Sequence, residues 1–383
     1  MKARTFLALF NVIAMVVAGV LTTGCASGHK EFAYVVGQGT NEVFTFRQQR
    51  NGTLTPLGVP NFPAGSIPVA MAAHSSGLFL YVANSAGNNL TQLDINKGNG
   101  ELSVPVSSSV VAPINPINIF NTGSTPIAVA MSPKDPFLFV ANQGSGDITA
   151  FTVDPGSGSL SLIGTTPVVQ QPAPPAPPIV VNPQSMAVSP KGDFLYVANA
   201  AQGTIAVLTI GAKGVLGYAP GSPFSVGASA TPTSIVAEST GRFVYAADPA
   251  ENAVLAFSVQ SNGTLSPITG SPFVSGAQTS AVAVDPQGAL LFAANTGSSS
   301  VSAFGIDSKS GALGQVSGSP FATGGIGPSA LAVNTNTTVV YVTDQVTHDI
   351  AALGIQSNGG LKAIAGSPFP VAAGGVAITL VQE

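Results

Sequence analysis

The chain has 383 residues and a formal net charge of −4, and only 7% of its residues are charged. A weakly charged composition that is rich in Val, Ile, Leu and Phe excludes an intrinsically disordered protein, which needs charge and few such residues. The lack of a basic run argues against nucleic-acid binding, because phosphate contacts require a cationic face. With 44 Gly and 30 Pro residues, the sequence predicts many turns and short strands.

The start of the chain is typical of an export signal. Two basic residues precede an apolar run, Phe6–Leu21, which is shorter than the roughly 20 residues of a membrane-spanning helix. The segment "LTTGCAS" follows, contains the only cysteine, Cys25, and resembles a bacterial lipoprotein signal. We therefore expect residues 1–25 to be a lipoprotein-type signal segment, Cys25 to carry the lipid, and residues 26–30 to be a tether. An ordinary secreted protein is the alternative.

A lipidated Cys25 would place the protein in the bacterial cell envelope. We expect an exported lipoprotein at the outer membrane or on its periplasmic or extracellular side. Its contact with the membrane would be through the N-terminal lipid only. With a single cysteine, no disulfide can form within the chain, so stability must come from the core and from closure of the fold.

Residues 31–383 contain seven copies of one motif, each centred on an aromatic residue in a strand such as "FLYVAN". These aromatic residues are Tyr34, Tyr81, Phe139, Tyr196, Tyr245, Phe292 and Tyr341. Each copy predicts four short strands, and the second strand is apolar throughout, as expected for burial on both faces. Four strands in each of seven such repeats predict an all-β, seven-bladed β-propeller with four-stranded blades.

The two ends of the repeat region complement each other. The first copy begins at Glu31 and lacks an opening strand, whereas the chain ends in an additional strand, Gly374–Val381. We therefore expect the C-terminal strand to complete blade 1 and close the ring, which removes a sheet edge. A recurring "GSPF" segment supplies aromatic residues that we interpret as packing wedges between blades. They are Phe224, Phe273, Phe321 and Phe369.

Two versions of the repeat, "SPKGDFLYVAN" and the "YVTD" at Tyr341, resemble the lactonase-type seven-bladed propellers. That family includes 6-phosphogluconolactonase-like proteins, and the chain also resembles exported YVTN-repeat proteins. The resemblance implies the propeller fold and lactone hydrolysis. Lactonase-like enzymes carry a "PRH"-type motif where a first strand begins, but no matching position here holds Arg or His. The matching positions are Pro126-Ile127-Ala128, Pro183-Gln184-Ser185, Pro232-Thr233-Ser234 and Pro328-Ser329-Ala330. No catalytic residue can be transferred from the family.

Charged residues are predicted to divide between the two faces of the disc. We name the site face as the one that carries the loops between second and third strands and the connections between blades. Every Lys and Arg beyond residue 30 is placed on the opposite face, so a phosphorylated substrate would lack a cationic clamp. The site face is expected to be acidic instead. Its acidic residues are Glu42, Asp147, Asp248, Glu251, Asp344 and Asp349.

Three uses of these residues remain open. Asp344, His348 and Asp349 are candidates for a general-base cluster that hydrolyses a lactone. The carboxylates are also candidate ligands for a cation such as Ca²⁺, which binds through oxygen atoms. The residues expected to bind a ligand or cation on the acidic face are Asp248, Glu251, Asp147 and Glu42. A solvated polar rim is the third interpretation.

Asn or Asp also ends the second strand in six copies, and we interpret it as a cap of the following turn through backbone N–H groups. The two long connections between blades, Pro105–Ser124 and Thr165–Gln184, are expected to add bulk to the site face. They are interpreted as a partner-docking strip, a lid, or tolerated insertions.

Two hypotheses on function follow. The sequence favours a monomeric, non-catalytic propeller that uses its acidic face to bind a protein or glycan partner at the envelope, with no cofactor. The missing Arg and His of the family motif and the missing cations of the site face carry this preference. The alternative is a lactonase-like hydrolase of the 6-phosphogluconolactonase type with an atypical catalytic set.

Overall fold

The computed structural model of the chain describes residues 31–58, 61–105, 118–171, 181–227, 229–372 and 374–382. The expected signal segment, Cys25 and the tether lie outside these residues, as do the central parts of both long connections. Within the described ranges, no helix is long and apolar enough to cross a membrane.

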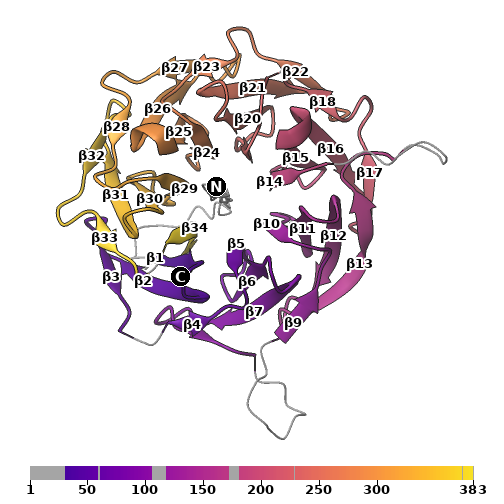
Figure 1. Cartoon of the computed structure of the whole chain (residues 1–383), viewed down its shortest axis with the longest axis horizontal. Coiled ribbons are helices and arrows are strands. Elements are labelled where there is room, and N and C mark those ends of the chain that lie inside the picture. Colours follow the sequence, from indigo (N-terminus) through magenta and orange to yellow (C-terminus); the bar gives the residue numbers. More distant parts are fainter. Residues whose placement is uncertain are drawn as a thin grey trace, which may run out of the picture.

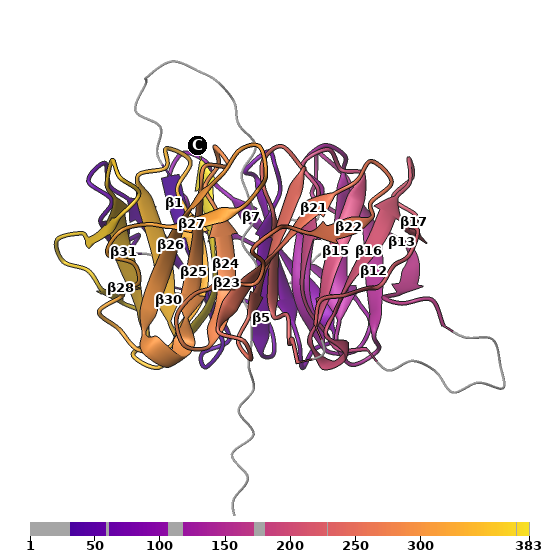
Figure 2. The ribbon, with the colours of Figure 1, turned by 90° about the horizontal axis from the view of Figure 1, so that it is seen from above.

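Seven antiparallel sheets radiate from a common axis, and each sheet is one blade (Figure 1). The innermost strands of blades 1 to 7 are β34 (Gly375–Gln382), β5 (Pro68–Ala73), β10 (Pro126–Met131), β14 (Pro183–Val188), β19 (Ser234–Ala237), β24 (Thr279–Val284) and β29 (Pro328–Val333). The second strands are β1 (Glu31–Gly37), β6 (Phe79–Asn84), β11 (Phe137–Asn142), β15 (Phe194–Asn199), β20 (Phe243–Asp248), β25 (Leu290–Asn295) and β30 (Val339–Asp344). Seen at right angles to the axis, the strands run between the two faces of a disc (Figure 2).

The third strands are β2 (Glu42–Gln48), β7 (Asn89–Ile95), β12 (Asp147–Val153), β16 (Thr204–Ile210), β21 (Ala253–Val259), β26 (Ser300–Ile306) and β31 (Asp349–Ile355). The fourth position is one long strand in blade 3, β13 (Leu160–Pro167). In the other blades two short strands share it, and both pair with the third strand. These are β3 (Leu54–Pro56) and β4 (Phe62–Pro63), β8 (Leu102–Ser103) and β9 (Asn118–Asn121), β17 (Leu216–Tyr218) and β18 (Phe224–Ser225), β22 (Leu265–Pro267) and β23 (Phe273–Val274), β27 (Leu313–Gln315) and β28 (Phe321–Ala322), and β32 (Leu361–Ala363) and β33 (Phe369–Pro370).

The aromatic residue of the repeated strand bonds four of the blades to the next one. The hydroxyl of Tyr341 in blade 7 donates a hydrogen bond of 2.8 Å to the carbonyl oxygen of Gly52 in blade 1. The same bond recurs from Tyr34 to Gly100, from Tyr81 to Gly158 and from Tyr245 to Gly311. The rings themselves are fully buried between neighbouring sheets. Four of the seven copies therefore supply a hydrogen bond between neighbouring blades, whereas Phe139 and Phe292 have no hydroxyl and that of Tyr196 has no hydrogen-bond partner among the described residues.

Ring closure occurs as the sequence predicts. Strand β34 pairs antiparallel with β1 over the whole of β1, from Glu31 opposite Gln382 to Gly37 opposite Gly375. Figure 1 shows the yellow C-terminal strand on the axial side of the indigo N-terminal strand. The "GSPF" aromatic residues are partly buried and pack against the hydrophobic core, in agreement with their interpretation as packing residues. They are Phe224, Phe273, Phe321 and Phe369.

Candidate functional site

The first strands of several blades begin with a β-bulge at the site face. In β5, β10 and β14 the pairing with the second strand skips the residue after the proline, which is Val69, Ile127 or Gln184. Bulges re-aim a side chain and are common beside active sites. All three residues line a cavity at the axis, as does Thr233 at the corresponding place in blade 5. Ile127, Gln184 and Thr233 are the middle residues of segments that we compared with the "PRH"-type motif, and the structure places them at a pocket.

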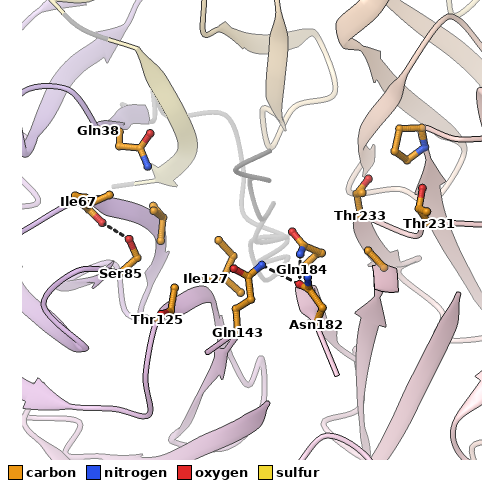
Figure 3. Close-up of a pocket in the computed structure, with 13 residues that line it drawn as sticks. Gln38, Ile67, Ser85, Thr125, Ile127, Gln143, Asn182, Gln184, Thr231 and Thr233 are labelled. Carbon is orange, nitrogen blue, oxygen red and sulfur yellow. Dashed lines mark hydrogen bonds between the residues drawn. The ribbon is translucent and has the colours of Figure 1, made fainter. Parts of the chain in front are cut away.

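The cavity has a volume of about 770 Å³, which is within the range of small-molecule sites. It is formed by blades 1 to 5, and Figure 3 shows the side chains that face it. The lining residues are Gln38, Ile67, Val69, Ser85, Thr125, Ile127, Gln143, Asn182, Gln184, Ala200, Thr231, Thr233 and Pro249. Among these described residues there is no Asp, Glu, Lys, Arg or His, so the lining itself carries no charge.

Three side-chain amides meet in one part of this cavity. The Nε2 atom of Gln143 donates a hydrogen bond of 2.9 Å to Oδ1 of Asn182, and Nε2 of Gln184 donates to the same oxygen atom (Figure 3). Each glutamine Nε2 carries a second hydrogen, and the Nδ2 atom of Asn182 carries two. We call Gln143, Asn182 and Gln184 the amide cluster. It can offer neutral hydrogen-bond donors to a carbonyl or hydroxyl group of a ligand.

Apolar and polar side chains are mixed around the cavity wall. Ile67, Val69 and Ile127, which we call the apolar arc, lie in blades 2 and 3 and share that side with the polar residues Ser85, Thr125 and Gln143. Asn182, Gln184, Thr231 and Thr233, which we call the polar arc, lie in blades 4 and 5 beside Ala200 and Pro249. Figure 3 shows Ile67 and Thr233 on opposite sides of the opening. A ligand that fits both arcs has an apolar side and a hydrogen-bonding side.

The predicted acidic residues are spread over blades 1, 3, 5 and 7 and do not line this cavity. Glu42 in blade 1 accepts a hydrogen bond from Asn61, Asp147 in blade 3 accepts one from Asn142, and Glu251 in blade 5 accepts one from Ser229. No group of three or more His, Cys, Asp or Glu side chains that could hold a metal ion is found within the described ranges. Cation binding by these residues stays a prediction.

The turn-capping interpretation is correct for Asp248 and wrong for four of its counterparts, Asn84, Asn142, Asn199 and Asn295. Oδ1 of Asp248 accepts hydrogen bonds from the backbone N–H groups of Ala250 and Glu251, in the turn that follows, and from that of Thr231. Asn84 and Asn142 instead use their Nδ2 atoms to reach across to the third strand of the same blade. The chain position is shared, but an amide can donate where a carboxylate can only accept.

The structure brings Asp344 and Asp349 together in blade 7. They are opposite each other at the ends of β30 and β31, and Asp344 is 0% exposed. Oδ1 of Asp344 accepts a hydrogen bond of 3.1 Å from the hydroxyl of Thr323. Burial raises the pKa of Asp344 to about 7; the Thr323 bond opposes this rise and the nearby Asp349 adds to it. Neither carboxyl group is among the residues that line the cavity.

His348 takes part in a different contact. Its backbone is left-handed, with φ of 57°, and its Nδ1 atom accepts a hydrogen bond of 2.6 Å from the backbone N–H of Gly374. In blades 1, 2 and 5 an asparagine at this position accepts the same bond from the start of the next blade. These pairs are Asn41 with Ile67, Asn88 with Thr125, and Asn252 with Gln278. The structure therefore gives His348 a bond between blades, and its role as a general base stays a prediction.

Sequence reasoning overlooked the amide cluster. Gln184 was considered only as a position that lacks the family's arginine, and Gln143 and Asn182 carry no motif. The one available signal was that Gln184 replaces an arginine at a position expected at the channel mouth. An uncharged polar residue there can form hydrogen bonds without adding charge to the cavity.

The fold and the cavity define a seven-bladed β-propeller with an uncharged, ligand-sized pocket on its axis. Residues 25–217 and 218–324 match the family described as "Lactonase, 7-bladed beta-propeller". These two matches cover well over half of the chain, and the protein belongs to this family.

Individual relatives are distant. The 6-phosphogluconolactonase of Bacillus subtilis (strain 168) is 26% identical over 133 residues, which are 34% of this chain and 36% of that enzyme. The solved structure of a candidate 6-phosphogluconolactonase from Bacteroides fragilis NCTC 9343 is 19% identical, with a TM-score of 0.76 over 94% of this chain and 100% of that chain. The periplasmic gluconolactonase of Pseudomonas aeruginosa is also 19% identical, with a TM-score of 0.74 over 92% and 99%. At these identities the structural likeness establishes the fold.

Proposed function

We propose that this protein is a lactonase-type hydrolase that opens an uncharged lactone in the axial cavity. The observation that carries this proposal is the amide cluster, which lines a ligand-sized cavity at the position of the family's motif. Membership of the lactonase family supports the hydrolase hypothesis over the non-catalytic one that the sequence alone favours.

The proposed reaction is ring opening by water. The oxygen atom of a water molecule attacks the lactone carbonyl carbon, and the bond from that carbon to the ring oxygen breaks. One proton of the water moves to the departing ring oxygen, and the new carboxylic acid releases the other to solvent. Negative charge develops on the carbonyl oxygen during attack, and preorganised amide donors stabilise such charge. Gln143, Asn182 and Gln184 would supply these donors, while the protons would travel through water because the described lining has no titratable group.

The cavity lining also limits the class of substrate. A phosphorylated sugar lactone needs Lys or Arg for its phosphate, and none is among the lining residues. The apolar arc of Ile67, Val69 and Ile127 instead suits an aliphatic substituent. We therefore propose an uncharged lactone with one apolar side, whose carbonyl group faces the polar arc.

A second candidate function is binding without turnover. The absence of an Asp, Glu, His or Lys from the described lining favours it, because general acid–base catalysis normally uses one of these groups. In that case the amide cluster would hold a neutral lactone or sugar without opening a ring.

One set of assays separates the two functions. Acid release from aliphatic and sugar lactones, with and without a phosphate, is followed for the full chain beside a buffer blank, and ligand binding is followed by the thermal shift. We expect turnover of uncharged lactones above the blank. It should fall at least tenfold in Gln184→Ile, which copies the isoleucine of blade 3 and so should fold. The control is Gln356→Ile, which changes an exposed glutamine outside the cavity.

Each outcome has a distinct meaning. A thermal shift without acid release would replace the hydrolase proposal with the binding function. Turnover that prefers phosphorylated lactones would contradict the substrate class, and turnover unchanged in Gln184→Ile would remove the amide cluster from the mechanism. If the assays detect no binding and no turnover, both proposals are contradicted.

A further inference from the structure

Blade 7 pairs two carboxyl groups where blades 2 and 3 pair an amide with an acceptor. The last residue of the second strand lies opposite the first residue of the third strand in every blade. In blade 2 the Nδ2 atom of Asn84 donates to Oδ1 of Asn89 at 2.8 Å. In blade 3 Asn142 donates to Oδ1 of Asp147 at 2.7 Å. In blade 7 the two opposite residues are Asp344 and Asp349.

Two ionised carboxylates at this position have no hydrogen atom to share, since each can only accept. Oδ2 of Asp344 and Oδ1 of Asp349 are buried and have no hydrogen-bond partner among the described residues. The backbone of Gly325 closes over both oxygen atoms, since a Cβ atom at Gly325 would lie 2.5 Å from the first and 2.6 Å from the second. Solvent therefore cannot replace the missing hydrogen bond without movement of this segment.

No cation compensates the pair within the described structure. Strands β30 and β31 contribute only the two carboxyl groups, and the segment before β29 contributes Thr323 and Gly325. The loop between Asp344 and Asp349 contributes His348, whose Nδ1 atom is bonded to Gly374 in the strand that follows. An unpaired buried charge is costly, and a like charge beside it increases that cost.

We propose that Asp344 and Asp349 share one proton, and that loss of this proton loosens the junction of blade 7 with the closing strand. The pair lies at this junction, because Asp349 is opposite Pro370 in β33 and the next segment bonds to His348 on its way to β34. With one proton, the pair reproduces the donor and acceptor of Asn142 and Asp147. Without it, two negative charges face each other under Gly325.

The direction of the pH effect follows from the rise in the pKa of Asp344 to about 7, which has burial as its largest cause. The folded protein holds the proton more tightly than the unfolded chain does. The stabilising contribution is therefore fully present below the ordinary pKa of an aspartate and is lost as the pH rises through about 7. Closure of the ring should be weaker in alkaline than in mildly acidic solution.

The test compares thermal unfolding of the full chain at about pH 5 and about pH 8.5 in three proteins. Asp344→Asn restores the Asn–Asp pair of blade 3. We expect it to raise the Tm on the order of 5 °C at the alkaline pH and by clearly less at the acidic pH, where most of the contribution of the proton is retained. The control, Asp147→Asn, copies the Asn–Asn pair of blade 2 and should follow the wild-type pH profile. Glu31, whose pKa burial also raises to about 7, titrates in all three proteins and cancels from the comparison.

A spectroscopic measurement checks the proton directly. The infrared C=O band of a protonated carboxylic acid should be present in the wild-type protein at about pH 6 and reduced in Asp344→Asn, whereas Asp147→Asn should retain it. Parallel pH profiles of Asp344→Asn and wild type would contradict the shared proton. Stabilisation of the wild type, but not of Asp344→Asn, by Ca²⁺ at the alkaline pH would also overturn it and assign the pair to a cation.

Discussion

Blade 3 and blade 7 share the plan of their first three strands but fill its polar positions differently. Their second strands, β11 and β30, are buried along their whole length. At the end of this strand blade 3 has Asn142 and blade 7 has Asp344, and the residue skipped at the start of the first strand is Ile127 in one blade and Ser329 in the other. The comparison teaches that the apolar strand positions specify a blade. The polar residues at the strand ends differ from blade to blade, and they determine the hydrogen bonding and charge of each blade.

If the apolar positions specify a blade, both blades should lose the same stability when the glycine that contacts their buried second strand is replaced by alanine. Gly214 meets Phe137 of blade 3 and Gly52 meets Val339 of blade 7, and both have left-handed backbones. Gly214→Ala and Gly52→Ala should each cost about 3 kcal/mol, from backbone strain and from overpacking. The measurement is the free energy of unfolding in urea. The control is Gly58→Ala, where φ is also positive but nothing lies within 4 Å, and the expected cost is about 1 kcal/mol.

If Gly214→Ala lowers the free energy of unfolding and Gly52→Ala does not, the two blade junctions are not equivalent. This result would mean that the junction of blade 7 with blade 1 is already loose in solution, so that an added methyl group meets no resistance.

A smaller loss of stability is expected when the buried tyrosine of blade 7 is replaced. Blade 3 has Phe139 where blade 7 has Tyr341, whose hydroxyl bonds the carbonyl oxygen of Gly52. Tyr341→Phe makes blade 7 resemble blade 3 and should cost about 1 kcal/mol, because one buried hydrogen bond is lost. Calorimetric unfolding measures this loss, and a variant as stable as wild type would mean that the hydroxyl bond adds nothing to ring closure.

The smallest effect is expected at His348. Because asparagine accepts the equivalent bond in three other blades, His348→Asn should change the free energy of unfolding by less than about 0.5 kcal/mol, whereas His348→Ala should lose about 1 kcal/mol. Lactone turnover should be unchanged in both variants. Loss of turnover in His348→Asn with stability retained would instead support a general base.

The sequence was sufficient to predict the number of blades and the closure of the ring, because both depend on residues that recur. An aromatic residue such as Tyr81 marks the second strand of each repeat, and the unpaired C-terminal strand, Gly374–Val381, marks the place where the ring closes. The site was harder to predict. The bulge that turns Gln184 to the axis depends on the pairing of β14 with β15, and it brings Gln184 to the same cavity as Gln143, which is 41 positions earlier in the chain. Single residues with no repeated pattern give no signal of such a meeting.

The acidic residues illustrate the same limit. Their loops were assigned to one face, but a ring separates neighbouring loops by the width of a blade. Glu42, Asp147 and Glu251 consequently have separate local partners. Asp248 and Glu251 share one turn, and Asp344 and Asp349 are opposite each other in one hairpin. Residues of one chemical kind on one face form a site only where the pairing register brings them together.

The position of β34 has a consequence for the synthesis of the protein. Strand β1 is among the first segments of the propeller to leave the ribosome, yet its partner Gly375–Gln382 is among the last. Until then a nascent chain carries blade 1 with an open inner edge, and open strand edges recruit other chains. Blade 1 therefore cannot be completed until the C-terminal strand has been synthesised. A chaperone that covers the inner edge of β1 during synthesis would prevent it from pairing with strands of other chains.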